Sequence, residues 1–256
     1  MGTKNNTNFL WLLSAFSLIS SVSLIPHVGS AEDYYVSAAI GAALPNNKMN
    51  AVYIQQDNLT SGATSVATKK RRLGSSMLWD VSLGRRLYKD FFLSLEFAHE
   101  NHKFHDAGSY DVSVSGVIKA NNGSYQYKTK IRASSLFVNL NHRFVTNVGV
   151  TPYLALGAGI SLNKVNDMNY ISTVSPLGNT ASSTDNINGR QVRNFAWQIG
   201  GGVLLHASQN IKIDASYKYR ALGNVKSGVS SDINGQTLFS RKLSTSNFML
   251  GVTYDF

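Results

Sequence analysis

The most concentrated charge in this chain is a run of four cations, Lys69, Lys70, Arg71 and Arg72. Ammonium and guanidinium groups bind sulfate and phosphate, and arginine can do so through two parallel hydrogen bonds. The run therefore predicts contact with an anionic ligand. Two ligand classes remain open, sulfated glycans and the anionic headgroups of a lipid surface. Further cations follow along the chain at Lys103, Lys119, Lys128, Lys130, Arg132, Arg241 and Lys242.

A second set of charges lies inside apolar segments. Glu96 interrupts a run of phenylalanine and leucine, and Lys218 and Arg220 alternate with tyrosines. Alternation sends the charged side chains to one face of a strand and the apolar ones to the other. Charges that face an enclosed interior need partners. We therefore expect a salt-bridged lumen network in which Glu96 faces one or more of Arg143, Lys218 and Arg220. A narrow ion pathway is the alternative.

The histidines invite a metal or catalytic hypothesis. His99, His102 and His105 recur every three residues, but on a strand this spacing alternates faces, so the three cannot converge on one metal ion. His99 and His142 share the face of the neighbouring apolar residues, as a lipid-modifying enzyme would require. No motif fixes a nucleophile, a base and an orienting acid together. We predict no catalytic residues, no metal and no cofactor.

The elements that must position these residues are β-strands. Strict alternation is clearest in the last nine residues, where Phe248, Leu250, Val252, Tyr254 and Phe256 share one face. Segments of about ten residues are long enough to cross a bilayer as tilted strands. The pattern predicts eight of them, at 34–43, 77–86, 91–100, 134–144, 151–161, 195–205, 211–220 and 247–256.

The polarity of the faces indicates a membrane. In 211–220 one face carries Lys212, Asp214, Lys218 and Arg220, and the other is apolar or tyrosine. A membrane barrel turns its apolar face to lipid and its polar face to the lumen. The predicted connections alternate between short (87–90, 145–150, 206–210) and long (44–76, 101–133, 162–194, 221–246). We therefore predict an all-β fold: an eight-stranded antiparallel transmembrane β-barrel with four long extracellular loops and three short periplasmic turns.

The first residues are typical of a secretory signal peptide. Lys4 precedes an apolar stretch, Pro26 ends it, and small residues follow. We predict a signal peptide at 1–31, cleaved after Ser30 or Ala31, and a barrel domain at 32–256. The chain has no cysteines, so it has no disulfide framework, and its formal net charge is +10. A basic exported protein is attracted to anionic surfaces.

Several phrases resemble one family. Thr151-Pro-Tyr-Leu-Ala-Leu-Gly-Ala-Gly159, Phe195-Ala-Trp-Gln-Ile-Gly-Gly-Gly202, Ile211-Lys-Ile-Asp-Ala-Ser-Tyr-Lys-Tyr-Arg220 and the terminal Tyr254-Asp-Phe256 resemble the small outer-membrane barrels of the outer membrane protein A and opacity protein superfamily. The nearest resemblance is to surface antigens of Rickettsiales and related alphaproteobacteria. It implies insertion by the barrel assembly machinery, with Phe256 as the assembly signal.

The sequence thus predicts an outer-membrane surface antigen of a Gram-negative bacterium. Its exposed loops would contact a host glycan or receptor, with Lys69–Arg72 as the anionic-ligand contacts, and the barrel would sit in outer-membrane lipid. A small passive porin is the alternative, and a lipid-modifying enzyme is the lesser one. No fold feature supports nucleic-acid binding.

Overall fold

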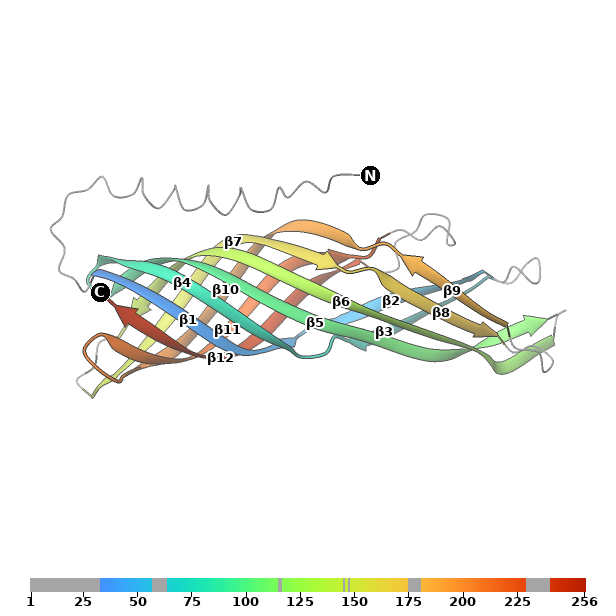
Figure 1. Cartoon of the computed structure of the whole chain (residues 1–256), viewed down its shortest axis with the longest axis horizontal. Helices are drawn as coiled ribbons and strands as arrows, with labels where there is room; N and C mark the ends of the chain where they lie inside the picture. Colours follow the sequence, from blue (N-terminus) through green and yellow to red (C-terminus); the bar gives the residue numbers. More distant parts are fainter. Residues whose placement is uncertain are drawn as a thin grey trace, which may run out of the picture.

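The described part of the chain is built almost entirely of β-strands (Figure 1). The computed structural model describes residues 33–56, 64–114, 117–144, 146, 148–174, 181–228 and 240–256, so the predicted signal peptide lies outside the described residues. Among these residues no helix is long and apolar enough to cross a membrane. The strands are β1 (Tyr34–Pro45), β2 (Lys48–Gln56), β3 (Thr64–Arg72), β4 (Ser76–Tyr88), β5 (Phe91–Val114), β6 (Val117–Arg143), β7 (Val150–Val165), β8 (Met168–Val174), β9 (Ala181–Ile187), β10 (Arg190–His206), β11 (Ile211–Lys226) and β12 (Ser240–Asp255).

Eight of these strands close into a barrel. Their order is β5-β4-β1-β12-β11-β10-β7-β6, and β6 returns to pair with β5. Every pairing is antiparallel, from Tyr35 opposite Asp255 on β1 and β12 to Leu95 opposite Val138 on β5 and β6. Closure removes the exposed sheet edges that an open sheet would carry. The predicted eight-stranded antiparallel barrel is confirmed, and each of the eight predicted segments overlaps one barrel strand.

The barrel is much longer than the predicted strands. β5 has 24 residues and β6 has 27, whereas about ten suffice to cross a bilayer. At about 3.3 Å per residue, β5 spans about 80 Å. The prediction of long loops at 44–76, 101–133 and 162–194 is therefore corrected, because most of these residues continue barrel strands or form the hairpins β2–β3 and β8–β9. Polar residues can form strands there, because pairing with neighbouring strands satisfies their backbone hydrogen bonds.

The short turns and the barrel termini lie at one end of the molecule, and the long extensions and added hairpins lie at the other (Figure 1). The hairpin β8–β9 continues the main sheet, because β8 pairs with the distal half of β6. The hairpin β2–β3 forms a separate two-stranded sheet. We call the end with the extensions the outer end.

The polarity of the barrel wall reverses along its length. Near the short turns the outward residues are apolar and exposed, as with Leu140 and Leu156, while inward residues such as Asn139 are polar and buried. Toward the outer end the inside becomes an apolar core, and the outside carries exposed cations. The largest members of this core are Leu73, Phe104, Ile131, Phe137, Val165, Met168, Ile187, Leu222, Val225 and Leu243. The reversal separates a lipid-facing belt from a water-facing extension.

Candidate functional site in the lumen and on the outer surface

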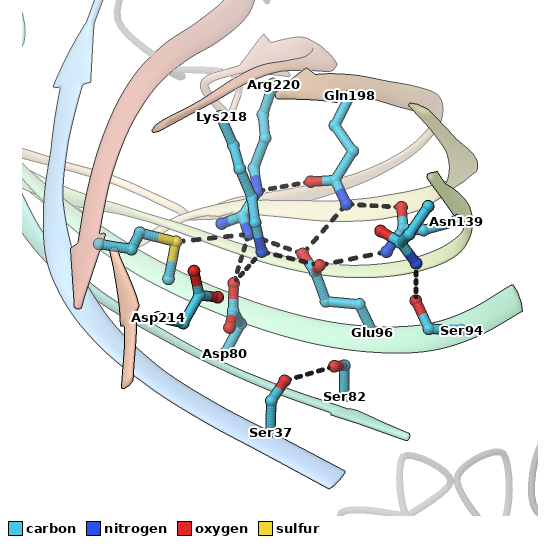
Figure 2. Close-up of polar contacts among 12 residues, drawn as sticks. Ser37, Asp80, Ser82, Ser94, Glu96, Asn139, Gln198, Asp214, Lys218 and Arg220 are labelled. Carbon is cyan, nitrogen blue, oxygen red and sulfur yellow. Dashed lines mark hydrogen bonds and ion pairs between the residues drawn. The ribbon is translucent and has the colours of Figure 1, made fainter. Parts of the chain in front are cut away.

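Four charged side chains meet in the middle of the lumen. They come from three strands, with Asp80 on β4, Glu96 on β5, and Lys218 and Arg220 on β11 (Figure 2). Lys218 Nζ lies 3.0 Å from Asp80 Oδ2 and 2.9 Å from Glu96 Oε2. Arg220 Nη2 lies 2.7 Å from Asp80 Oδ2 and 2.7 Å from Glu96 Oε1. Two carboxylates and two cations therefore balance, and each charge contacts both opposite charges.

Neutral side chains complete this central network. Gln198 on β10 accepts a hydrogen bond from Arg220 Nε at 2.9 Å and donates one to Glu96 Oε1 at 3.1 Å. Asn139 on β6 donates to Glu96 Oε2 at 3.1 Å and accepts from Gln198 at 2.7 Å. The network thus links five of the eight barrel strands across the lumen (Figure 2). Such contacts can satisfy buried charge that would otherwise be costly.

Arg143, the third predicted partner of Glu96, lies in a different group near the short turns. Its guanidinium sits 3.9 Å from the Phe92 ring centroid and 4.6 Å from that of Tyr35. Its Nη1 lies 3.6 Å from Asp255 Oδ1, and Lys212 also pairs with Asp255. The structure therefore brings Glu96 together with Lys218 and Arg220, but not with Arg143.

A third polar group lies on the outer side of the central network. His102 is fully buried, and its Nε2 lies 3.0 Å from Glu100 Oε2. The other ring nitrogen lies 3.2 Å from the carbonyl oxygen of Gly74, in the segment that links β3 to β4. The histidine therefore ties this segment to β5. His99 faces the opposite side of the wall from His102, as the spacing predicts. The described residues contain no cluster of three or more potential metal ligands.

His99 is the side chain nearest to the arrangement that a lipid-modifying enzyme would need. Its Nδ1 lies 2.9 Å from Ser134 Oγ on the outward face of the barrel, and its ring packs against Trp79. Among the described residues no carboxylate hydrogen-bonds His99, because Glu100 points inward to His102. At His142, Nδ1 lies 3.2 Å from the backbone carbonyl oxygen of Arg143. Ser134 and His99 therefore meet without an orienting acid among the residues that the structure describes.

The basic run Lys69–Arg72 lies at the end of β3 rather than in a loop. In the hairpin β2–β3, Lys69 is opposite Ala51 and Arg72 is opposite Lys48. The side chains of these residues lie outside the described part of the structure. Backbone pairing alone brings a fifth cation, Lys48, opposite Arg72 at the end of the hairpin that is farthest from its turn.

Phe256, the predicted assembly signal, follows β12 at the periplasmic rim. Its amide donates to the Tyr34 carbonyl at 2.9 Å. Its half-exposed ring meets the Tyr254 ring edge-on, with centroids 5.1 Å apart. The Phe256 side chain therefore lies on the outward-facing side of the closing strand β12, away from the lumen.

Sequence reasoning did not include three members of the central network, Asp80, Asn139 and Gln198. All three share the inward parity of their strands, so the alternation pattern placed them in the lumen. What the pattern lacked was their height along the barrel axis, which depends on the register between strands.

No protein-family model matches the sequence. The chain is 28% identical over 239 residues to outer membrane protein PagN of Salmonella typhimurium, covering 88% of this chain and 90% of that protein. Among solved structures, Neisserial surface protein A is similar, with 17% identity, 89% and 98% of the two chains covered and a TM-score of 0.44. Ail, the attachment invasion locus protein of Yersinia pestis, solved with the heparin analogue sucrose octasulfate, has 18% identity, 88% and 99% coverage and a TM-score of 0.37.

The apolar belt of the closed barrel, its polar lumen and the similarity to a curated outer-membrane protein agree with one another. The chain is an outer-membrane β-barrel, of the small eight-stranded type.

Proposed function

We propose that this protein is a surface-displayed binding protein, an adhesin-like antigen, and that its hairpin β2–β3 presents the basic run Lys69–Arg72 to sulfated or other anionic glycans on a host surface. The observation that carries the proposal is the position of this run. Four consecutive cations lie on a hairpin that forms its own sheet at the outer end of the barrel. A rigid scaffold that holds variable segments away from the membrane is a common design for recognition.

The paired lumen supports display rather than conduction. Arg220, Phe137 and Leu222 are fully buried inside the barrel, and an eight-stranded barrel is just wide enough for side chains to fill it. We also propose a role in binding and not in catalysis, because the His99–Ser134 pair has no described carboxylate partner. Insertion by the barrel assembly machinery and kinship with alphaproteobacterial surface antigens stay predictions from the resemblance.

The test is binding of the refolded mature barrel to immobilised heparin at rising salt. A variant with Lys69, Lys70, Arg71 and Arg72 replaced by Ser should elute at clearly lower salt than the wild type, because its sulfate contacts are removed. A matched control replaces four other outward-facing cations by Ser, Lys103, Lys130, Arg132 and Lys164, and should elute with the wild type. If both variants eluted at equally reduced salt, or if the wild type did not bind heparin, the hairpin would not be the recognition element.

A further inference from the structure

Two pairs of like charges lie directly opposite each other on the outside of the barrel. Lys103 on β5 is in register with Lys130 on β6, and Arg132 on β6 is in register with Lys164 on β7. All four side chains are exposed. Directly opposed residues hold their Cβ atoms about 5 Å apart, and like charges at that position destabilise a sheet. We call these four residues the cation ladder.

The acids of the described part of the chain do not neutralise this ladder. The described side chains that face outward from β5, β6 and β7 include no aspartate or glutamate, and no ion pair joins the four cations to a described carboxylate. Glu100, three residues before Lys103, is buried in the lumen beside His102, and Asp167, three residues after Lys164, accepts a hydrogen bond from the Gly189 amide. Within the described residues, the repulsion is therefore left for an external anion to relieve.

The ladder lies where the wall polarity reverses. Arg132 is one outward position above Ser134, which is in register with His99 and Leu162, and two above Leu136. Below it, Trp79 packs on Phe97 with ring centroids 5.5 Å apart. Aromatic side chains gather at this level in membrane barrels, where headgroups meet acyl chains. Cations just above an aromatic shelf match a molecule with phosphates at one end and acyl chains at the other.

We propose that the cation ladder binds the phosphate groups of an outer-leaflet glycolipid, whose acyl chains lie against Phe97, Trp79 and Leu136. A lipid fits this position better than a soluble polyanion, because the ladder borders the apolar belt while β5 and β6 continue far beyond it. Arg132 and Lys164 would grip the phosphate nearest the belt, and Lys103 and Lys130 the next group outward. This site is separate from the hairpin β2–β3.

The test measures the thermal unfolding midpoint of the refolded mature chain in phosphatidylcholine vesicles with and without lipopolysaccharide. Lipopolysaccharide should raise the midpoint of the wild type. The variants Arg132→Gln/Lys164→Gln and Lys103→Gln/Lys130→Gln should lose at least half of that rise. In pure phosphatidylcholine the same variants should unfold at or above the wild-type midpoint, because their repulsion is gone. Lys226→Gln/Lys242→Gln removes two cations from the opposite wall and should keep the full rise.

Further arms separate the possible ligands. Dephosphorylated lipopolysaccharide should give no rise, and neither should soluble inorganic phosphate or heparin. Equal losses in the opposite-wall control would show diffuse attraction and overturn the site. A full rise in both ladder variants, or protection by heparin instead of lipid, would overturn it as well. The variant with Lys69–Arg72 replaced should respond normally to lipopolysaccharide, so failure of this site and failure of the proposed function are distinguishable.

Discussion

Arg220 shows that the contribution of an ion pair to stability depends on how deeply the pair is buried. Its side chain is fully buried and contacts two carboxylates that are nearly as buried. Removing such charges from water costs several kcal/mol per ion, and a well-packed apolar substitute for the whole group can be neutral or stabilising. Removal of a single partner is different, because it leaves an uncompensated charge in the lumen.

At this scale we predict the effect of Arg220→Met on the free energy of unfolding. The substitution leaves Asp80 and Glu96 with Lys218 alone, and should cost about 3–5 kcal/mol. Urea unfolding in lipid vesicles measures it, with Arg190→Met, an exposed cation on β10, as the control at under about 0.5 kcal/mol. Adding Glu96→Gln should recover part of the loss. A loss near that of the control would mean that water, and not Arg220, solvates the two acids.

At the scale of elements, alternation predicted which side chains face the lumen but not how far along the axis they lie. Glu96 is in register with Phe137, whereas Arg143 lies six residues further along β6, about 20 Å away. Parity therefore identified Lys218 and Arg220 correctly as possible partners, and could not show that Arg143 belongs with Asp255. Register depends on pairing between strands far apart in sequence.

The lengths of β5 and β6 were missed for a related reason. Beyond Glu100 the alternation continues with reversed polarity, since Phe104 points inward and Lys103 outward. Reading strands only by a lipid-facing apolar stripe ends them where the membrane ends. The reversal itself is visible in the sequence, in His102-Lys103-Phe104 and in Lys130-Ile131-Arg132-Ala133, and it marks the upper edge of the belt.

The closing strand β12 carries the next prediction, on Phe256→Ala. The ring is half-exposed and contacts Tyr254, so its loss should change the free energy of unfolding by only about 1 kcal/mol. If the C-terminal aromatic is read by the assembly machinery, the amount of protein in the outer membrane of living cells should fall severalfold. Refolding yield in detergent should stay the same. Tyr254→Ala, which removes a neighbouring ring and keeps the terminal one, is the control. Equal losses in cells and in detergent would indicate a packing role instead.

At the scale of the whole molecule, one part of the barrel wall faces lipid and the other part faces water. Its lower part is polar inside and apolar outside, and its outer extension has an apolar core like that of a water-soluble barrel. The charged network and the apolar core follow each other along the barrel axis. The network closes the lumen within the apolar belt, and the core closes it again beyond the belt. An ion crossing the barrel would have to displace Arg220 from its carboxylates and then pass between Phe104, Leu222 and Leu243, all at most 2% exposed.

These two closures predict that the wild-type protein in planar bilayers shows no unitary conductance steps. Removing one charge of each sign, in Glu96→Ala/Arg220→Ala, keeps the lumen neutral and leaves Lys218 paired with Asp80, but opens only the lower closure. That variant should therefore stay silent too. Combining it with Phe104→Ala and Leu243→Ala opens both closures and should produce small steps, provided that heat-dependent gel mobility shows the barrel folded. Steps from the wild type would favour the porin alternative. Conductance steps from the variant Glu96→Ala/Arg220→Ala would mean that ions pass through the apolar core, and that the charged network alone blocks conduction in the wild type.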